Sequence, residues 1–72
     1  MHYVYVLKQG KYDYYIGYTK NLSRRYTEHR KYGSWQLLYY EAYGSESLAR
    51  VRERRLKYYG SAWRALKRRI NA

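Results

Sequence analysis

Arg25 and His29 stand where a helix packed on a core would ordinarily carry aliphatic residues. Residues 22 to 32 predict a helix, and its inward stripe at the spacing i, i+3, i+4, i+7 consists of Leu22, Arg25, Tyr26 and His29. Because Arg25 and His29 are four residues apart, they project from the same side of the helix and can converge on one ligand. A guanidinium fork suits a phosphate group. The alternative is that Arg25 lies along the surface with its charge in water and that His29 is an ordinary boundary histidine.

Glu53 is the next residue whose type could do chemistry. It lies in a predicted helix over residues 46 to 58, and it is the only acid beside nine basic residues between positions 50 and 72. The apolar residues of this helix predict a buried arc, with Glu53 at its border, that consists of Leu48, Ala49, Val51, Leu56 and Tyr59. Glu53 is either an ion-pair partner of Arg50, Arg54 or Lys57, or a carboxylate that binds a divalent cation such as Mg²⁺.

The chain is short and strongly basic. Its 72 residues contain 16 Lys and Arg against 5 Asp and Glu, which gives a formal charge of +11 concentrated in residues 50 to 72. Such a charge predicts a polyanionic partner, and DNA, RNA or an anionic membrane satisfies the electrostatics alone. Aliphatic residues are few, but 13 tyrosines can supply a small core. The length predicts one domain, spanning residues 1–72.

Several classes of protein are excluded or disfavoured by composition. Cysteine is absent, so the chain has no disulfide framework, no thiolate zinc site and no cysteine nucleophile. No apolar run approaches the length of a membrane span, and the N-terminus lacks the regions of a signal peptide. We therefore expect a soluble, cytoplasmic protein with no membrane partner.

The sequence predicts a small α+β domain as the scaffold for these residues. β-Branched and aromatic residues predict strands over 3–8, 14–18 and 36–43. Helices are predicted over 22–32, 46–58 and 62–70, with Asn21, Ser45 and Ser61 as their N-caps. The order β-β-α-β-α-α predicts a small three-stranded antiparallel sheet flanked by helices. Gly17, inside the second strand, indicates a bulge or a place where another group lies close to the backbone.

The sequence resembles the GIY-YIG nuclease family along nearly its whole length. The strand pair YVYVLK and DYYIG, followed by YTKNLSRRYTEH, resembles the N-terminal half of that domain. The segment AYGSESLARVRERRLKYYGSAWRALKRRI resembles the C-terminal half of its small stand-alone members. The resemblance implies a three-stranded antiparallel sheet flanked by helices and a metal-dependent phosphodiesterase that acts on DNA, with Mg²⁺ as cofactor and Mn²⁺ as its substitute.

The resemblance also implies catalytic roles for five residues, namely Tyr5, Tyr15, Arg25, His29 and Glu53. Glu53 would hold the metal ion, which acts as a Lewis acid on a phosphate oxygen and the leaving group. Arg25 would bind the phosphate through its planar donor fork. Tyr5 is the candidate general base or water-positioning group, Tyr15 and His29 would orient the water and share its proton, and which of the three takes it stays open. Gly17 would let the substrate or a side chain approach the sheet backbone.

Basic residues outside this set predict the surface that contacts nucleic acid, and these are Arg24, Arg50, Arg54, Lys57, Arg64, Lys67 and Arg68. Phosphate contacts position a protein without reading bases, so we expect selection of DNA structure, such as a branch, flap or nick in double-stranded DNA. The sequence thus indicates an endonuclease of DNA repair or recombination that needs no obligate protein partner and is a monomer or a weak dimer. The alternative is a non-catalytic basic module that binds DNA or structured RNA.

Overall fold

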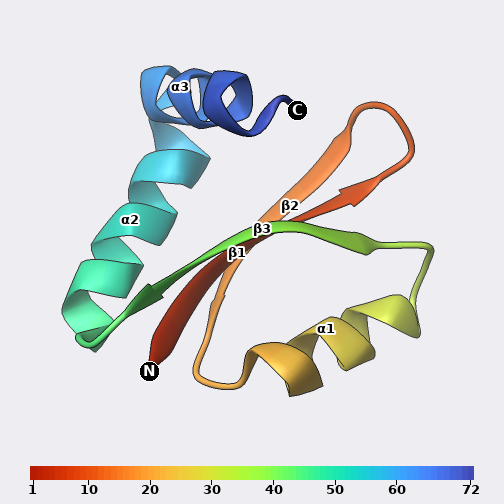
Figure 1. Cartoon of the computed structure of the whole chain (residues 1–72), viewed down its shortest axis with the longest axis horizontal. Helices are drawn as coiled ribbons and strands as arrows, with labels where there is room; N and C mark the ends of the chain where they lie inside the picture. The colour runs from red at the N-terminus through yellow and green to blue at the C-terminus, as the bar shows by residue number, and fades with distance from the viewer.

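The computed structural model describes all residues, 1–72, and contains three strands and three helices (Figure 1). The strands are β1 (His2–Gln9), β2 (Asp13–Thr19) and β3 (Gln36–Tyr43), and the helices are α1 (Leu22–Arg30), α2 (Glu46–Tyr58) and α3 (Gly60–Ile70). β1 is the central strand of an antiparallel sheet of order β2-β1-β3. The predicted α+β class and element order are therefore confirmed. None of the helices is long and apolar enough to cross a membrane.

Two of the three predicted N-caps are confirmed. The side-chain oxygens of Asn21 and Ser45 each accept a hydrogen bond from the backbone N–H three residues on, at 3.0 and 3.4 Å. The prediction for Ser61 is wrong, because α3 already begins at Gly60 and Tyr59 is its N-cap. Tyr59 has an extended backbone, and its carbonyl accepts hydrogen bonds from the amides of residues 62 and 63 at 3.0 and 3.3 Å. The chain therefore passes from α2 to α3 through a single non-helical residue.

The predicted end of α1 at residue 32 is wrong by two residues, because α1 ends at Arg30. The amides of Lys31 and Tyr32 bond to the carbonyls of Glu28 and His29, three residues back, at 3.2 and 3.0 Å. This tighter spacing is typical of the last turn of a helix. It turns the chain toward β3 within a few residues.

The two faces of the sheet are covered by different helices. In Figure 1, α1 lies on one side of the sheet and α2 and α3 lie on the other. Side chains alternate along β1, so Val4 and Val6 face α2 and α3, and Tyr5 and Leu7 face the α1 side. Val4 and Val6 are fully buried in a core that also contains Ala49, Leu56 and Leu66. The apolar core thus lies on one face of the sheet and leaves the other face to the α1 residues.

The predicted buried arc of α2 is only partly confirmed. Ala49 and Leu56 are buried, but Leu48, Val51 and Tyr59 are 60%, 38% and 63% exposed, so their predicted burial is wrong. Ala49 and Leu56 are seven residues apart and form one stripe that packs on the sheet. Leu48 and Val51 are rotated by about 100° and 200° from Ala49 around the helix axis, which turns them away from it. Because α2 packs on the sheet through this narrow stripe, its remaining apolar residues face outward.

A carboxylate on β3 ties the sheet to α2 and α3. Glu41 accepts hydrogen bonds from Arg52 Nε at 3.0 Å, from the Tyr39 hydroxyl at 2.6 Å and from the Tyr43 hydroxyl at 2.5 Å. Arg69 donates to the Tyr39 hydroxyl at 2.7 Å and lies 3.9 Å from Glu41. Burial alone would raise the pKa of Glu41, but the hydrogen bonds from Arg52 and the two tyrosines outweigh it and lower the pKa. Arg52 and Arg69 are therefore held by structural contacts in the free protein.

Candidate active site

Four of the five predicted catalytic side chains meet on the α1 side of the sheet. The Tyr5 hydroxyl lies 3.1 Å from His29 Nε2, and Arg25 Nε donates a hydrogen bond to the same hydroxyl at 3.4 Å. The Tyr15 ring lies against His29 and near Tyr5, with ring centroids 4.6 and 6.1 Å apart. One strand pair and one helix therefore bring together two phenols, a guanidinium and an imidazole.

The pairing register of the hairpin places the two tyrosines on one face. Tyr5 pairs with Gly17 and Leu7 pairs with Tyr15, and paired residues of antiparallel strands share a face. Tyr15 therefore lies diagonally across from Tyr5, within reach of its ring. A slip of the hairpin by one residue would turn Tyr15 to the opposite face, where Tyr14 and Ile16 pack on the core.

Gly17 provides the space for the Tyr5 side chain. A Cβ built on Gly17 would lie 2.5 Å from Tyr5 Cζ and 2.9 Å from Tyr15 Cε1, closer than real Cβ atoms come. The Tyr5 ring therefore lies against the bare backbone of β2, and only glycine permits this approach. Of the two alternatives that the sequence left open at this position, the structure shows close approach by a side chain.

The direction of the hydrogen-bond chain through Tyr5 depends on the tautomer of His29. Arg25 Nε can only donate, so the Tyr5 oxygen is the acceptor of that bond. His29 Nε2 lies within hydrogen-bond distance of the same oxygen, and it accepts the Tyr5 proton in the tautomer that carries its own proton on Nδ1. In that tautomer the chain of donors runs from Arg25 to Tyr5 to His29.

The pKa shifts keep Tyr5 and His29 uncharged at neutral pH. Burial raises the pKa of Tyr5 above its usual value of 10.0, and the hydrogen bond from Arg25 opposes this shift without cancelling it. Burial, followed by the charge of Arg25, lowers the pKa of His29 below 6.5. A lasting Tyr5 phenolate is therefore disfavoured, and His29 is the group with a free electron pair for a proton.

The guanidinium end of the Arg25 side chain borders a shallow hollow in the surface at α1. This hollow has a volume of about 300 Å³ and is lined by Arg25, Glu28, His29, Lys31 and Tyr32. Glu28 Oε2 accepts a hydrogen bond from Arg25 Nη1 at 3.1 Å, while the Arg25 side chain stays 44% exposed. The contacts with Tyr5 and Glu28 raise the pKa of Arg25, so its charge is permanent. A phosphate that enters the hollow meets the Arg25 guanidinium and Lys31 together with the Glu28 carboxylate that already binds Arg25.

Glu53 lies apart from this group, in α2 on the other side of the sheet. Its Oε2 is 3.2 Å from Lys57 Nζ, and the side chain is 16% exposed. Its charge acts on Tyr18, which packs on the core between the sheet and α2. No contact joins Glu53 to Tyr5 or Arg25. Glu53 thus forms the predicted ion pair, and its partner is Lys57. Metal binding by Glu53 stays a prediction.

The donor chemistry around Glu53 bears on the predicted metal ion. No group of three or more His, Asp or Glu side chains could hold a metal ion. Mg²⁺ can be held by one carboxylate when substrate phosphates and waters complete its six ligands. A cation at Glu53 would therefore need a phosphate and waters for its remaining ligands and would compete with Lys57 for the carboxylate.

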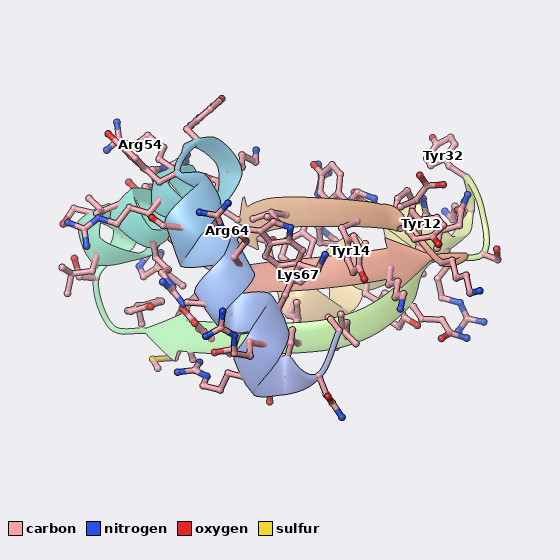
Figure 2. All side chains as sticks on the ribbon, turned by 90° about the horizontal axis from the view of Figure 1, so that it is seen from above. Tyr12, Tyr14, Tyr32, Arg54, Arg64 and Lys67 are labelled. Carbon is pink, nitrogen blue, oxygen red and sulfur yellow. The ribbon has the colours of Figure 1, made fainter.

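The predicted nucleic-acid contacts fall into two groups. Arg24, Arg50, Lys57 and Lys67 have partners: Arg24 pairs with Glu28 at 3.6 Å, and Lys57 pairs with Glu53. The Arg50 guanidinium stacks over Tyr18, and the Lys67 ammonium lies over Tyr14 and Trp63. The other three have no acidic side chain within ion-pair distance, and these are Arg54, Arg64 and Arg68. Arg54, Arg64 and Lys67 project from the α2 and α3 side in Figure 2.

Three residues around the group were missed by the sequence reasoning. Glu28 holds the outer end of Arg25, Trp35 packs on Tyr15 with ring centroids 6.3 Å apart, and Lys31 lines the hollow. The spacing of three residues between Arg25 and Glu28 is a signal for that contact. No sequence spacing indicates the contact of Trp35 with Tyr15, because this contact depends on the path of residues 31–35 between α1 and β3.

No protein-family model matches this chain, and no curated protein or solved structure matches it either. The function must therefore be inferred from the side chains themselves. The most specific arrangement among them is the hydrogen-bonded group of Arg25, Tyr5 and His29 beside a cationic hollow.

Proposed function

We propose that this chain is a divalent-metal-dependent endonuclease of the GIY-YIG type that hydrolyses DNA phosphodiester bonds and selects DNA by its structure. The observation that carries the proposal is the chain of hydrogen bonds from Arg25 through Tyr5 to His29, next to the hollow on α1. Phosphodiester hydrolysis needs a phosphate-binding cation and an acceptor for the proton of the attacking water. This group supplies both functions within a few ångströms.

Arg25 binds the scissile phosphate. Its Nε and Nη1 donate to Tyr5 and Glu28, and the remaining N–H groups of the partly exposed guanidinium donate to phosphate oxygens. Lys31 adds a second positive charge in the same hollow. These cations offset the charge that develops on the phosphoryl oxygens in the transition state.

Tyr5 and His29 remove the proton of the attacking water. The water gives its proton to the Tyr5 oxygen while the Tyr5 proton passes to His29 Nε2, so Tyr5 ends neutral and His29 ends as an imidazolium. The resulting hydroxide attacks phosphorus, the bond from phosphorus to the 3′ oxygen breaks, and the leaving oxygen takes a proton from solvent. The lowered pKa of His29 keeps it ready as an acceptor at neutral pH. Tyr15 packs on the His29 ring and fixes its orientation.

Glu53 is the residue that would hold Mg²⁺, or Mn²⁺ in its place. When bound, such an ion supplies Lewis-acid stabilisation of the phosphate and the leaving oxygen. The support for Glu53 in this role is the resemblance to GIY-YIG nucleases, and its carboxylate, which is 16% exposed, is paired with Lys57. Glu53 lies across the sheet from Tyr5 and Arg25, so no contact in this structure brings a metal ion at Glu53 to the phosphate that Arg25 would bind.

A second function is favoured by a separate observation. The carboxylate of Glu53 is paired with Lys57, and three arginines on α2 and α3 have no acidic partner. These features suit a non-catalytic module that binds DNA or structured RNA through phosphates. Such a module predicts salt-sensitive binding that is indifferent to a chelator and to Glu53→Ala.

Cleavage assays with purified protein distinguish the two functions. Supercoiled plasmid and branched duplexes are incubated with Mg²⁺ or Mn²⁺, with EDTA as the control. We expect Arg25→Lys to lower the cleavage rate by about 100-fold, because an ammonium cannot reproduce the two-sided donor fork. Arg30→Lys, a matched change at an exposed position of α1 that is outside the predicted nucleic-acid contacts, should leave the rate within about twofold. Absence of nicking by pure protein, or equal nicking by Glu53→Ala, would refute the nuclease.

A further inference from the structure

The outward face of α2 carries an aromatic and cationic surface that the proposed active site does not use. Val51, Arg54, Arg55 and Tyr58 follow the spacing i, i+3, i+4, i+7 and therefore share one face of the helix. Together with Tyr59 they line a shallow hollow of about 310 Å³. We call these five residues the α2 patch. The helix buries its opposite stripe, Ala49 and Leu56, so the patch faces solvent.

Two features make the α2 patch unusual for a solvated helix face. Tyr58 and Tyr59 are 75% and 63% exposed, and Val51 is exposed beside them. Neither Arg54 nor Arg55 has an acidic side chain within ion-pair distance. The aromatic rings are therefore accessible, and the nearby charges are free to bind an anion.

We propose that the α2 patch binds an unpaired DNA strand, with bases stacked on Tyr58 and Tyr59 and phosphates paired with Arg54 and Arg55. Proteins that bind single strands combine a cationic surface with exposed aromatic rings, because every base has a face that can stack. Duplex DNA hides its base faces, so phosphate binding to duplex alone would need the arginines but not the tyrosines. A second copy of this chain is disfavoured as the occupant, because it brings the same positive charge to the contact.

This inference deepens the proposed function and rests on it in one respect: if the chain is a nuclease, its substrate is a branched DNA with a single-stranded arm. The patch would hold the unpaired arm while the Arg25 group acts on a phosphodiester bond. A flap or a fork is then preferred to a simple nick.

Binding measurements in EDTA test the patch without cleavage. Fluorescence anisotropy with labelled oligothymidylate and with a blunt duplex is recorded for the wild type, Tyr58→Ala/Tyr59→Ala and Tyr58→Phe/Tyr59→Phe. Tyr12→Ala is the matched control, because Tyr12 is 84% exposed and lies at the far end of the molecule from Arg54 in Figure 2. We expect the double alanine variant to lose at least about fivefold in oligothymidylate affinity for each stacked base. Duplex binding, the phenylalanine variant and Tyr12→Ala should each stay within about twofold of the wild type.

Four results would overturn the proposal. The first two are an unchanged oligothymidylate affinity in the double alanine variant and an equal loss in Tyr12→Ala. The third is tighter, tyrosine-dependent binding to oligouridylate than to oligothymidylate, which would assign the patch to RNA. The fourth is a wild-type dimer in sedimentation velocity that the double alanine variant dissociates without loss of DNA binding. Tyrosine-dependent DNA binding with no cleavage in Mg²⁺ would refute the nuclease and keep the patch.

Discussion

Replacing Gly17 by alanine tests whether the Tyr5 ring must lie against the backbone of β2. The added Cβ would overlap Tyr5 Cζ at 2.5 Å, and the hydroxyl beyond it would also be in the way. Tyr5 is only 1% exposed, so its ring has no open space into which it can move. Relief of the overlap must shift the ring or the strand, and either shift pulls the hydroxyl away from Arg25 and His29.

The expected cost can be estimated from these contacts. Overpacking a buried site costs about 1–3 kcal/mol, and the weakened hydrogen bonds of Tyr5 add about 1 kcal/mol. The better strand propensity of alanine returns about 0.5–1 kcal/mol. We therefore expect Gly17→Ala to lower the free energy of unfolding by about 2 kcal/mol, which corresponds to a fall in Tm of roughly 8–16 °C for a domain of this size.

Urea unfolding followed by tyrosine and tryptophan fluorescence measures this change. Gly44→Ala is the matched control, because a Cβ built there has no atom within 4 Å. Its unfolding midpoint should stay near the wild-type value or rise slightly, since alanine lowers the entropy of the unfolded chain. Gly17→Ala should also lower the cleavage rate, whereas Gly44→Ala should not.

A double-mutant cycle with Tyr5→Leu separates steric overlap from a general loss of strand stability. Leucine lacks the Tyr5 ring atoms that the Gly17→Ala methyl would meet, so most of the cost of Gly17→Ala should disappear in that background, and only the contact with Tyr15 Cε1 at 2.9 Å remains. We expect a coupling of about 2 kcal/mol between the two changes. Additive effects would refute the idea that the Tyr5 ring makes glycine necessary at this position.

Three further predictions concern charge. Glu41→Ala should lower the free energy of unfolding by about 2–4 kcal/mol in urea, because it leaves the half-buried Arg52 without its carboxylate, whereas Glu28→Ala should cost under about 1 kcal/mol. Folding lowers the pKa of His29 below 6.5, so the unfolded chain binds more protons than the folded chain between the two pKa values. The free energy of unfolding should therefore fall as the pH drops below 6.5 toward the folded pKa. Urea midpoints measured across this range should show the slope, and His29→Gln should remove it. Arg68→Ala should weaken DNA binding on all sequences and reduce the salt slope of log K by about 0.9, as measured by anisotropy at several salt concentrations.

The bounds of β3 and α2 follow from the sequence alone because local signals agree there. QLLYYEAY is rich in aromatic and aliphatic residues, and Ser45 with Glu46 marks a helix start. The start of α3 was missed because Ser61 was predicted as the N-cap of this helix. Glycine after an extended residue such as Tyr59 can equally open a helix, and the packing of Leu66 on the core decides between the two.

The rotation of α2 could not be predicted, because its apolar residues are spread around the helix. Leu48, Val51 and Leu56 are equally apolar in sequence, but only Leu56 lies on the stripe that includes Ala49. The small side chain of Ala49 sets which face approaches the sheet, and the ion pair of Arg52 with Glu41 holds that orientation. Contacts between distant segments therefore decide which of the apolar residues are buried.

The candidate site was partly predictable. The spacing of Arg25 and His29 indicated that they share a helix face, whereas Tyr5 and Tyr15 were assigned to the site only by the resemblance, and the hairpin register brings them together. The protonation states were not predictable, because the pKa shifts of Tyr5 and His29 arise from burial in the folded protein. The sequence also gave no indication that Glu53 lies across the sheet from the other four.

The tyrosine hydroxyls explain why this chain uses tyrosine and no phenylalanine. Tyr18, Tyr39 and Tyr43 donate to carboxylates, namely Glu46 for the first and Glu41 for the other two. The hydroxyls of Tyr39 and Tyr43 connect apolar rings to the largely buried Glu41, which phenylalanine would leave with fewer partners, and the Tyr18 hydroxyl bonds to the exposed Glu46. Burial and the carboxylates raise the pKa values of these three phenols, that of Tyr43 to about 12, and a carboxylate is too weak a base to take their protons near neutral pH.

Tyr5 differs from those three tyrosines in its proton acceptor. Its hydroxyl lies within hydrogen-bond distance of the imidazole of His29, a stronger base than a carboxylate, and it accepts from a guanidinium that stabilises negative charge on its oxygen. A proton can therefore pass through Tyr5 to His29, whereas the protons of the other three stay on their phenols. Since all four hydroxyls have partners in the fold, it is the identity of the acceptor, and not the presence of a hydrogen bond, that makes Tyr5 suited to proton transfer.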